Sequence, residues 1–139
     1  MSRRIDIERL TDALNSVPAI RFALLFGSAR DGILLKIDSD IDVAIYLNHE
    51  PDLDERAHLL GLLQDAVGSD RVDVVFLNLT NNELLQREAL KGRLLFCRDL
   101  ETYAAFFSLA DRRGRDQEDR LKRAWALTHE LQRDNAIPL

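Results

Sequence analysis

The sequence predicts an α/β domain with about four strands, followed by a helical C-terminal extension. Three features predict it: short apolar runs, amphipathic stretches with helical spacing between them, and a helical pattern near the C-terminus. The chain has 139 residues, which is the size of one domain, and no repeat or linker divides it. We therefore expect a core at residues 1–98 and an extension of the same domain at residues 99–139.

The first half of the chain is predicted to form a helix and two strands. Apolar residues recur at helical spacing over residues 5–16, and Pro18 ends that helix. The apolar runs 21–26 and 41–47 have the length of strands, and Gly27 ends the first of them. Both are expected to be buried.

The second half is predicted to alternate helices with strands. Pro51 begins a helix that keeps its apolar residues on one face as far as Gly68. Residues 71–78 form the third expected strand. An asparagine at 81 or 82 then caps a helix that ends at Gly92, and the fourth, short strand is 93–97.

Residues 100–133 have a helical pattern. The charged stretch 111–120 inside it is either a solvated part of one long helix or a break at Gly114. The aromatic residues of this region either pack on the core or contact a partner protein. They include Phe106, Phe107 and Trp125.

Composition limits the kind of protein. The formal net charge is -5, which argues against direct nucleic-acid binding because such binding needs a basic surface. No apolar run reaches the roughly 20 residues that cross a bilayer, and charged residues interrupt the N-terminal segment, so we expect neither a membrane span nor a signal peptide. The single cysteine fits a reducing compartment, and the expected location is the cytoplasm.

Acidic residues occupy the starts of two predicted strands. Asp40 and Asp42 point to one face of the second strand, because they are two residues apart, and Asp73 stands in the same relation to the third. If the strands are adjacent, three carboxylates converge and repel one another unless a cation neutralises them. Such hard oxygen ligands suit Mg²⁺. For Asp73, capping a turn or pairing with an arginine stays open, and we interpret Asp38 as a turn residue.

Gly27 and Ser28 follow the first predicted strand directly. A glycine there lets the backbone approach a ligand closely, because no Cβ is in the way. Ser28 adds a hydroxyl and a backbone N–H, which suit phosphate. A Gly-Ser pair is common in turns, so the phosphate interpretation depends on the aspartates downstream.

The segments GSARDG, SDIDVAIYL and RVDVV together resemble the nucleotidyltransferase superfamily related to DNA polymerase β, and most of all its minimal, single-domain branch. The family pattern is a strand, Gly-Ser, a D-x-D motif on the next strand and a third acidic residue on a later one. This sequence departs from the family pattern in two ways. Asp31 stands where an arginine is expected, and the spacing from Gly-Ser to D-x-D is eleven residues, one more than usual. Both departures lie in the loop.

The resemblance implies a small mixed sheet of about four strands flanked by helices. It also implies ATP as substrate and two Mg²⁺ ions. Asp40 and Asp42 would hold Mg²⁺ on the triphosphate, and Asp73 would join them at the second ion. Gly27 and Ser28 would bind the outer phosphates.

Members of the minimal branch are typically encoded beside a HEPN-domain ribonuclease. The two proteins form a type VII-like toxin–antitoxin pair, in which the nucleotidyltransferase is the antitoxin. The resemblance therefore implies a protein adenylyltransferase that moves AMP from ATP to a tyrosine hydroxyl of the toxin and releases pyrophosphate. Two alternatives remain open at this point. One is transfer to a small-molecule hydroxyl, as in antibiotic nucleotidyltransferases, and the other is an antitoxin that acts by binding alone.

Overall fold

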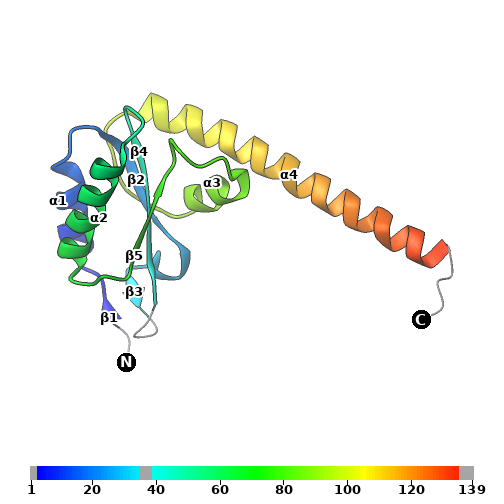
Figure 1. Cartoon of the computed structure of the whole chain (residues 1–139), viewed down its shortest axis with the longest axis horizontal. Coiled ribbons are helices and arrows are strands. Elements are labelled where there is room, and N and C mark those ends of the chain that lie inside the picture. Colours follow the sequence, from blue (N-terminus) through cyan, green and yellow to red (C-terminus); the bar gives the residue numbers. More distant parts are fainter. Residues whose placement is uncertain (1–2, 35–38, 135–139) are drawn as a thin grey trace.

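The structure, a computed structural model, describes residues 3–34 and 39–134. Figure 1 shows helices on both sides of a small sheet and one long helix that leaves the body of the protein. The elements, in chain order, are β1 (Arg3–Arg4), α1 (Ile7–Asn15), β2 (Ile20–Phe26), the short 3₁₀ helix η1 (Gly27–Ala29), β3 (Ile33–Leu34), β4 (Ile41–Leu47), α2 (Leu53–Val67), β5 (Val72–Phe76), α3 (Glu83–Leu90), β6 (Arg93–Cys97) and α4 (Leu100–Asp134).

The main sheet has four strands in the order β5-β4-β2-β6. β2 is antiparallel to both β4 and β6, whereas β4 and β5 are parallel. The predicted mixed sheet of about four strands is therefore confirmed. β1 and β3 form a separate two-stranded sheet that the sequence patterns did not predict, because each strand has only two residues.

Each face of the sheet has its own apolar cluster. On one face, Val43 and Ile45 of β4 pack with α1 and α2. On the other, Ala44 and Tyr46 of β4 pack with residues of α3 and α4. This alternation is what the period of a strand requires, and it fixes which side chains of β4 and β5 share a face.

Local signals set the helix boundaries, which lie within about two residues of the expected ones. The side chain of Asp52 accepts a hydrogen bond from the backbone N–H of Glu55, which caps α2. Gly68 ends α2 in the left-handed conformation, with φ 69°. Asn82, one of the two predicted caps, accepts from the N–H of Leu85 at the start of α3. The turn prediction for Asp38 lies outside the described residues.

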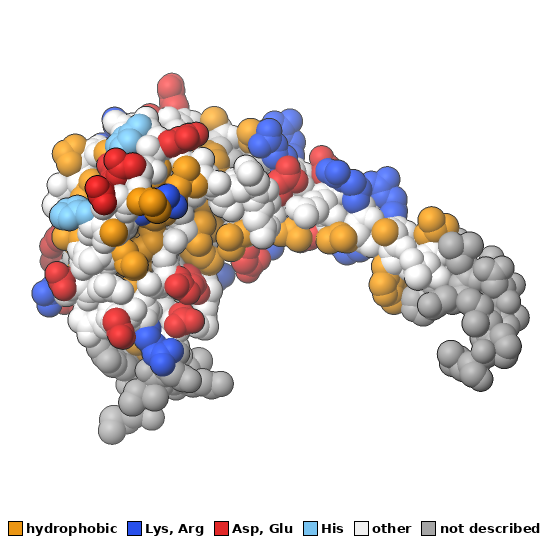
Figure 2. All heavy atoms as spheres, viewed as in Figure 1, with side chains coloured by type: hydrophobic (Ala, Val, Ile, Leu, Met, Phe, Trp, Pro, Cys, Tyr) orange, Lys and Arg blue, Asp and Glu red, His pale blue; other side chains and the backbone are white. Residues whose placement is uncertain are grey.

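Helix α4 is continuous through the charged stretch, so Gly114 does not break it. Gly114 is buried, and a Cβ there would collide with the side chain of Arg87 on α3. The aromatic residues divide: Phe106 packs on Tyr46, with ring centroids 5.2 Å apart, whereas Trp125 is 66% exposed. Figure 2 shows the end of α4 as an arm that projects from the rounded body. Among the residues that the structure describes, no helix is both long and apolar enough to cross a membrane.

Candidate active site

Asp42 and Asp73 lie opposite each other on adjacent strands. They are register partners in the parallel ladder of β4 and β5. Asp42 is in phase with Ala44 and Tyr46, so both carboxylates lie on the face of the sheet that α3 and α4 cover further along. The sequence predicted that the acids would converge if their strands were adjacent, and β4 and β5 are adjacent at Asp42 and Asp73.

Asp42 is in an unfavourable environment for a charged carboxylate. Burial raises the pKa of Asp42 most, and the negative charges of Asp73 and Asp40 raise it further. A bound cation would act in the opposite direction, because it stabilises the ionised form. The electrostatics at Asp42 thus favour either a proton or a metal ion between the strands.

Asp40 lies outside the ladder that pairs these two residues, although its charge still raises the pKa of Asp42. It precedes β4, is exposed, and its Oδ1 lies 3.9 Å from Nη1 of Arg71. In the described part of the chain, no group of three His, Cys, Asp or Glu side chains is arranged to hold a metal ion. The sequence predicted a convergence of three carboxylates, and the structure brings two of them into register. Those two fit a divalent cation by the chemistry of their donors, which are hard oxygens that suit Mg²⁺.

Gly27 brings the backbone against the Asp42 carboxylate. Its φ is 74°, and a Cβ on this residue would overlap Oδ2 of Asp42. The register explains the contact, because Phe26, the last residue of β2, is the partner of Asp42 on β4. Ser28 follows in the same 3₁₀ turn and is exposed. The predicted Gly-Ser loop and the D-x-D motif therefore meet at one place.

Basic residues that the sequence reasoning missed border the same loop. Nη1 of Arg30 donates to the carbonyl oxygen of Lys91 at 3.5 Å. Nη1 of Arg93 lies 3.9 Å from the position that a Cβ on Gly32 would take. Lys91 and Arg93 come from the α3–β6 junction, about sixty residues further along the chain, so no local pattern could reveal them. Lys91 contributes only its backbone carbonyl to the loop, since its ammonium lies 3.7 Å from Oε2 of Glu88. The guanidinium of Arg93 is thus the positive group beside Gly32, and such a group suits phosphate.

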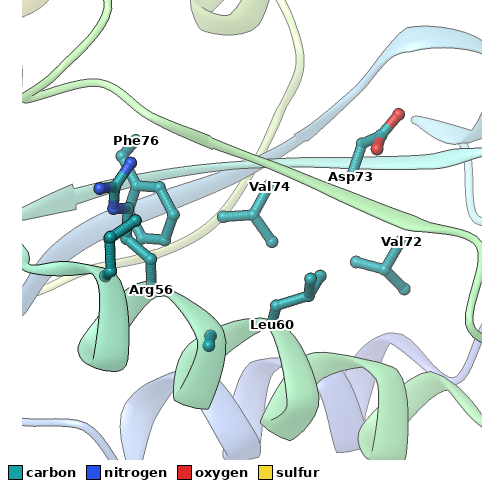
Figure 3. Close-up of a pocket in the computed structure, with 8 residues that line it drawn as sticks. Arg56, Leu60, Val72, Asp73, Val74 and Phe76 are labelled. Carbon is teal, nitrogen blue, oxygen red and sulfur yellow. The ribbon is translucent and has the colours of Figure 1, made fainter.

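A groove of about 350 Å³ runs between α2 and the free edge of β5. Figure 3 shows Leu60, Val72 and Val74 turned toward this groove, whereas the carboxylate of Asp73 points to the other side of the strand. The groove and the carboxylate pair therefore lie on opposite faces of β5. No sequence pattern predicted the groove, which depends on how α2 packs beside the edge strand.

Comparisons with known proteins agree with this fold. Residues 8–101 match the family model described as polymerase beta, nucleotidyltransferase. A search of curated proteins gave no match. Among solved structures, a toxin–antitoxin complex with AMP-PNP has a TM-score of 0.69 and 22% identity, and the alignment covers 91% of this chain and 99% of that chain.

Two further solved structures have the same fold. A MntA-HpeT toxin–antitoxin complex gives a TM-score of 0.71 at 21% identity, over 91% of this chain and 99% of that one. The complex of a tri-AMPylated HEPN toxin with MNT antitoxin from Shewanella oneidensis gives 0.63 at 20% identity, over 90% and 95%. The family model spans most of the chain and includes the loop at Gly27 and both in-register aspartates, so this chain belongs to the polymerase beta nucleotidyltransferase family.

Proposed function

We propose that this chain is a protein adenylyltransferase that neutralises a HEPN ribonuclease toxin by transferring AMP from ATP to a tyrosine hydroxyl. The observation that supports it most is the in-register pair Asp42 and Asp73 beside the Gly27 backbone, in a chain of the nucleotidyltransferase family. The likeness to toxin–antitoxin complexes, one of which holds an AMPylated HEPN toxin, supports the choice of acceptor.

The roles of the residues follow from their positions. Asp42 and Asp73 would hold Mg²⁺, with Asp40 as the third acid. To bind the ion, Asp40 would turn away from the guanidinium of Arg71. When bound, Mg²⁺ neutralises charge on the triphosphate and lowers the pKa of the attacking hydroxyl. Ser28 donates from its hydroxyl and backbone N–H to the outer phosphates, and Arg93 adds a positive charge beside Gly32.

The acceptor oxygen attacks the α-phosphorus of ATP, a new P–O bond forms and pyrophosphate leaves. A tyrosine hydroxyl has a pKa near 10, so it is mostly protonated at neutral pH and needs its proton removed as it attacks. Catalysis is then positioning and charge neutralisation, and no covalent bond between enzyme and AMP is required. The product places a bulky phosphodiester with one negative charge on the toxin, where it competes with the phosphates of RNA.

Intact-mass measurement of the toxin tests this proposal. The toxin is incubated with this chain, ATP and Mg²⁺, and we expect a gain of one AMP unit for each modified tyrosine. Asp42→Asn should abolish the gain. Asp65→Asn, which removes an exposed carboxylate on α2, is the matched control and should leave it unchanged.

Other outcomes would assign the chain a different role. If the toxin's mass stays constant while its ribonuclease activity is suppressed, the chain acts by binding alone. If the toxin is neither modified nor bound but AMP still appears on a small hydroxyl compound, the acceptor is a small molecule.

A further inference from the structure

The end of α4 forms an arm that does not pack on the core. We define the arm as residues 119–128, all of which are exposed. Just before it, the carboxylate of Glu118 pairs with Nη1 of Arg87 on α3 at 2.7 Å. Beyond that ion pair the helix runs away from the body of the protein (Figure 1). An isolated helical segment of this length is marginal in water, so the arm depends on the packed part of α4 or on a partner.

The arm has an apolar stripe that continues the buried face of α4. Residues three or four apart share a face of a helix, and the positions of α4 that face the core include Tyr103, Phe106, Ala110 and Gly114. The same spacing continues to Leu121, which is 57% exposed, and to Trp125, which is 66% exposed. Figure 2 shows apolar side chains along the lower edge of the projecting helix, with most of its basic side chains in this view above them. The packing face of α4 thus extends past the core that it packs on.

We propose that this stripe docks the protein acceptor of the transfer reaction, through an apolar groove between helices on the acceptor's surface. This inference rests on the proposed function. Helix α4 packs on the face of the sheet that bears Asp42 and Asp73, so a protein held on the arm stands on the side where the carboxylates are exposed to ligand. The arm also lies beyond residue 101, where the match to the nucleotidyltransferase family model ends. It is therefore available for a task other than nucleotide chemistry.

A second copy of this chain fits the stripe less well. Arg120 and Lys122 flank Leu121 on the helix, so two arms paired along their stripes would bring four cations together. A partner of different sequence avoids this repulsion. Docking on the arm would also raise the effective concentration of the acceptor hydroxyl at the site. A large exposed Trp with an adjacent Leu is the kind of anchor that contributes most to protein interfaces.

The test is a double variant, Leu121→Glu with Trp125→Glu, assayed for transfer to the toxin. Both residues are exposed, so the fold should be kept, which circular dichroism checks. We expect the KM for the toxin to rise about tenfold or more, with the affinity for a non-hydrolysable ATP analogue unchanged. Leu127→Glu is the control, because Leu127 is 58% exposed on a different face of the arm. It gains one negative charge, so it is compared with each single variant, Leu121→Glu and Trp125→Glu, as well as with the double variant.

The outcomes separate the docking role from the proposed function. If the wild-type chain modifies the toxin and the double variant does so with the same KM, the docking proposal is wrong and the proposed function stands. If the wild-type chain never modifies the toxin, the proposed function fails, and binding measured by calorimetry still tests the arm: the double variant should lose it and Leu127→Glu should keep it. A wild-type dimer in sedimentation that the double variant dissociates would show that the stripe joins two copies and would overturn the proposal.

Discussion

Replacing Gly27 by alanine should reduce AMP transfer far more than its effect on the stability of the fold can explain. Gly27 has φ 74°, a conformation that L-residues rarely adopt, and its absent Cβ leaves room for the carboxylate of Asp42. Alanine therefore brings two changes: a strained backbone, and a methyl group where Oδ2 of Asp42 now lies. The methyl group must displace that carboxylate, because the backbone of β2 is fixed between two strands.

The chain contains a matched control for the first change. Gly68 has φ 69°, almost the same conformation, and nothing lies within 4 Å of the position of its Cβ. Gly68→Ala should therefore lose only the conformational term, about 1–2 kcal/mol. Gly27→Ala should lose a similar free energy of unfolding, because the Asp42 side chain can rotate away. Displacing a group that positions the reacting atoms by about 1 Å costs about 100-fold in rate.

Urea unfolding and the rate of AMP transfer to the toxin, measured on both variants, decide the question. We expect comparable losses of stability and a large loss of transfer in Gly27→Ala alone. Near-ultraviolet circular dichroism establishes that each variant is folded at the assay temperature. If Gly27→Ala transfers AMP as fast as Gly68→Ala, the contact between the loop and Asp42 has no part in the reaction, and the argument from the missing Cβ is wrong.

Three further predictions concern single side chains. Ser28→Ala should weaken the binding of an ATP analogue by about 1.5–3 kcal/mol, the value of a hydrogen bond to a charged group, and an unchanged calorimetric affinity would make Ser28 a turn residue only. In metal-free buffer Asp42→Asn should raise the free energy of unfolding at pH 7. Because the pKa of Asp42 is raised in the folded chain, this gain should fade as the pH is lowered through that raised value, and a pH series of urea unfolding that shows no gain at pH 7 contradicts the prediction. The hydrogen bond and charge of Arg87 hold the pKa of Glu118 below its ordinary 4.5, so the pair stabilises the fold above that pH and the contribution is lost as the pH falls through the lowered value. The difference in melting temperature between the wild-type chain and Glu118→Gln should therefore shrink in acid, and a constant difference would show that the pair does not couple to folding.

The sequence was sufficient for the elements that local rules determine. The strands at 41–47 and 93–97 have the predicted bounds, because a short apolar run between polar residues has few other ways to be buried. Helix α2 ends at Gly68, as its position after the last apolar residue predicted. The alternation along 41–47 also placed Asp42 on the face opposite Val43 before any strand was paired.

Properties that depend on pairing were beyond these rules. No local sequence pattern predicts that β5 lies beside β4 and parallel to it. This pairing brings Asp73 into register with Asp42. The same limit applies to Arg93, which reaches the loop at Gly32 because β6 is the antiparallel neighbour of β2. The contact between Asp40 and Arg71, the residue just before β5, is another consequence of the pairing of β4 with β5.

The two in-register carboxylates oppose the stability of the fold that holds them. Burial and like charge raise the pKa of Asp42, so at neutral pH its ionised form destabilises the folded chain. Gly27 adds a second cost, because a glycine loses more conformational freedom on folding than any other residue. Both destabilising contributions arise at one contact, between the backbone of Gly27 and the carboxylate of Asp42. A divalent cation would turn the repulsion between Asp42 and Asp73 into attraction, so it should raise the melting temperature of the wild-type chain. In Asp42→Asn, where the repulsion is already gone, the same cation should give a much smaller increase. The substitution and the cation thus relieve the same repulsion, one by removing the charge of Asp42 and the other by neutralising it. A cation that raised the melting temperature of both proteins equally would have to bind elsewhere.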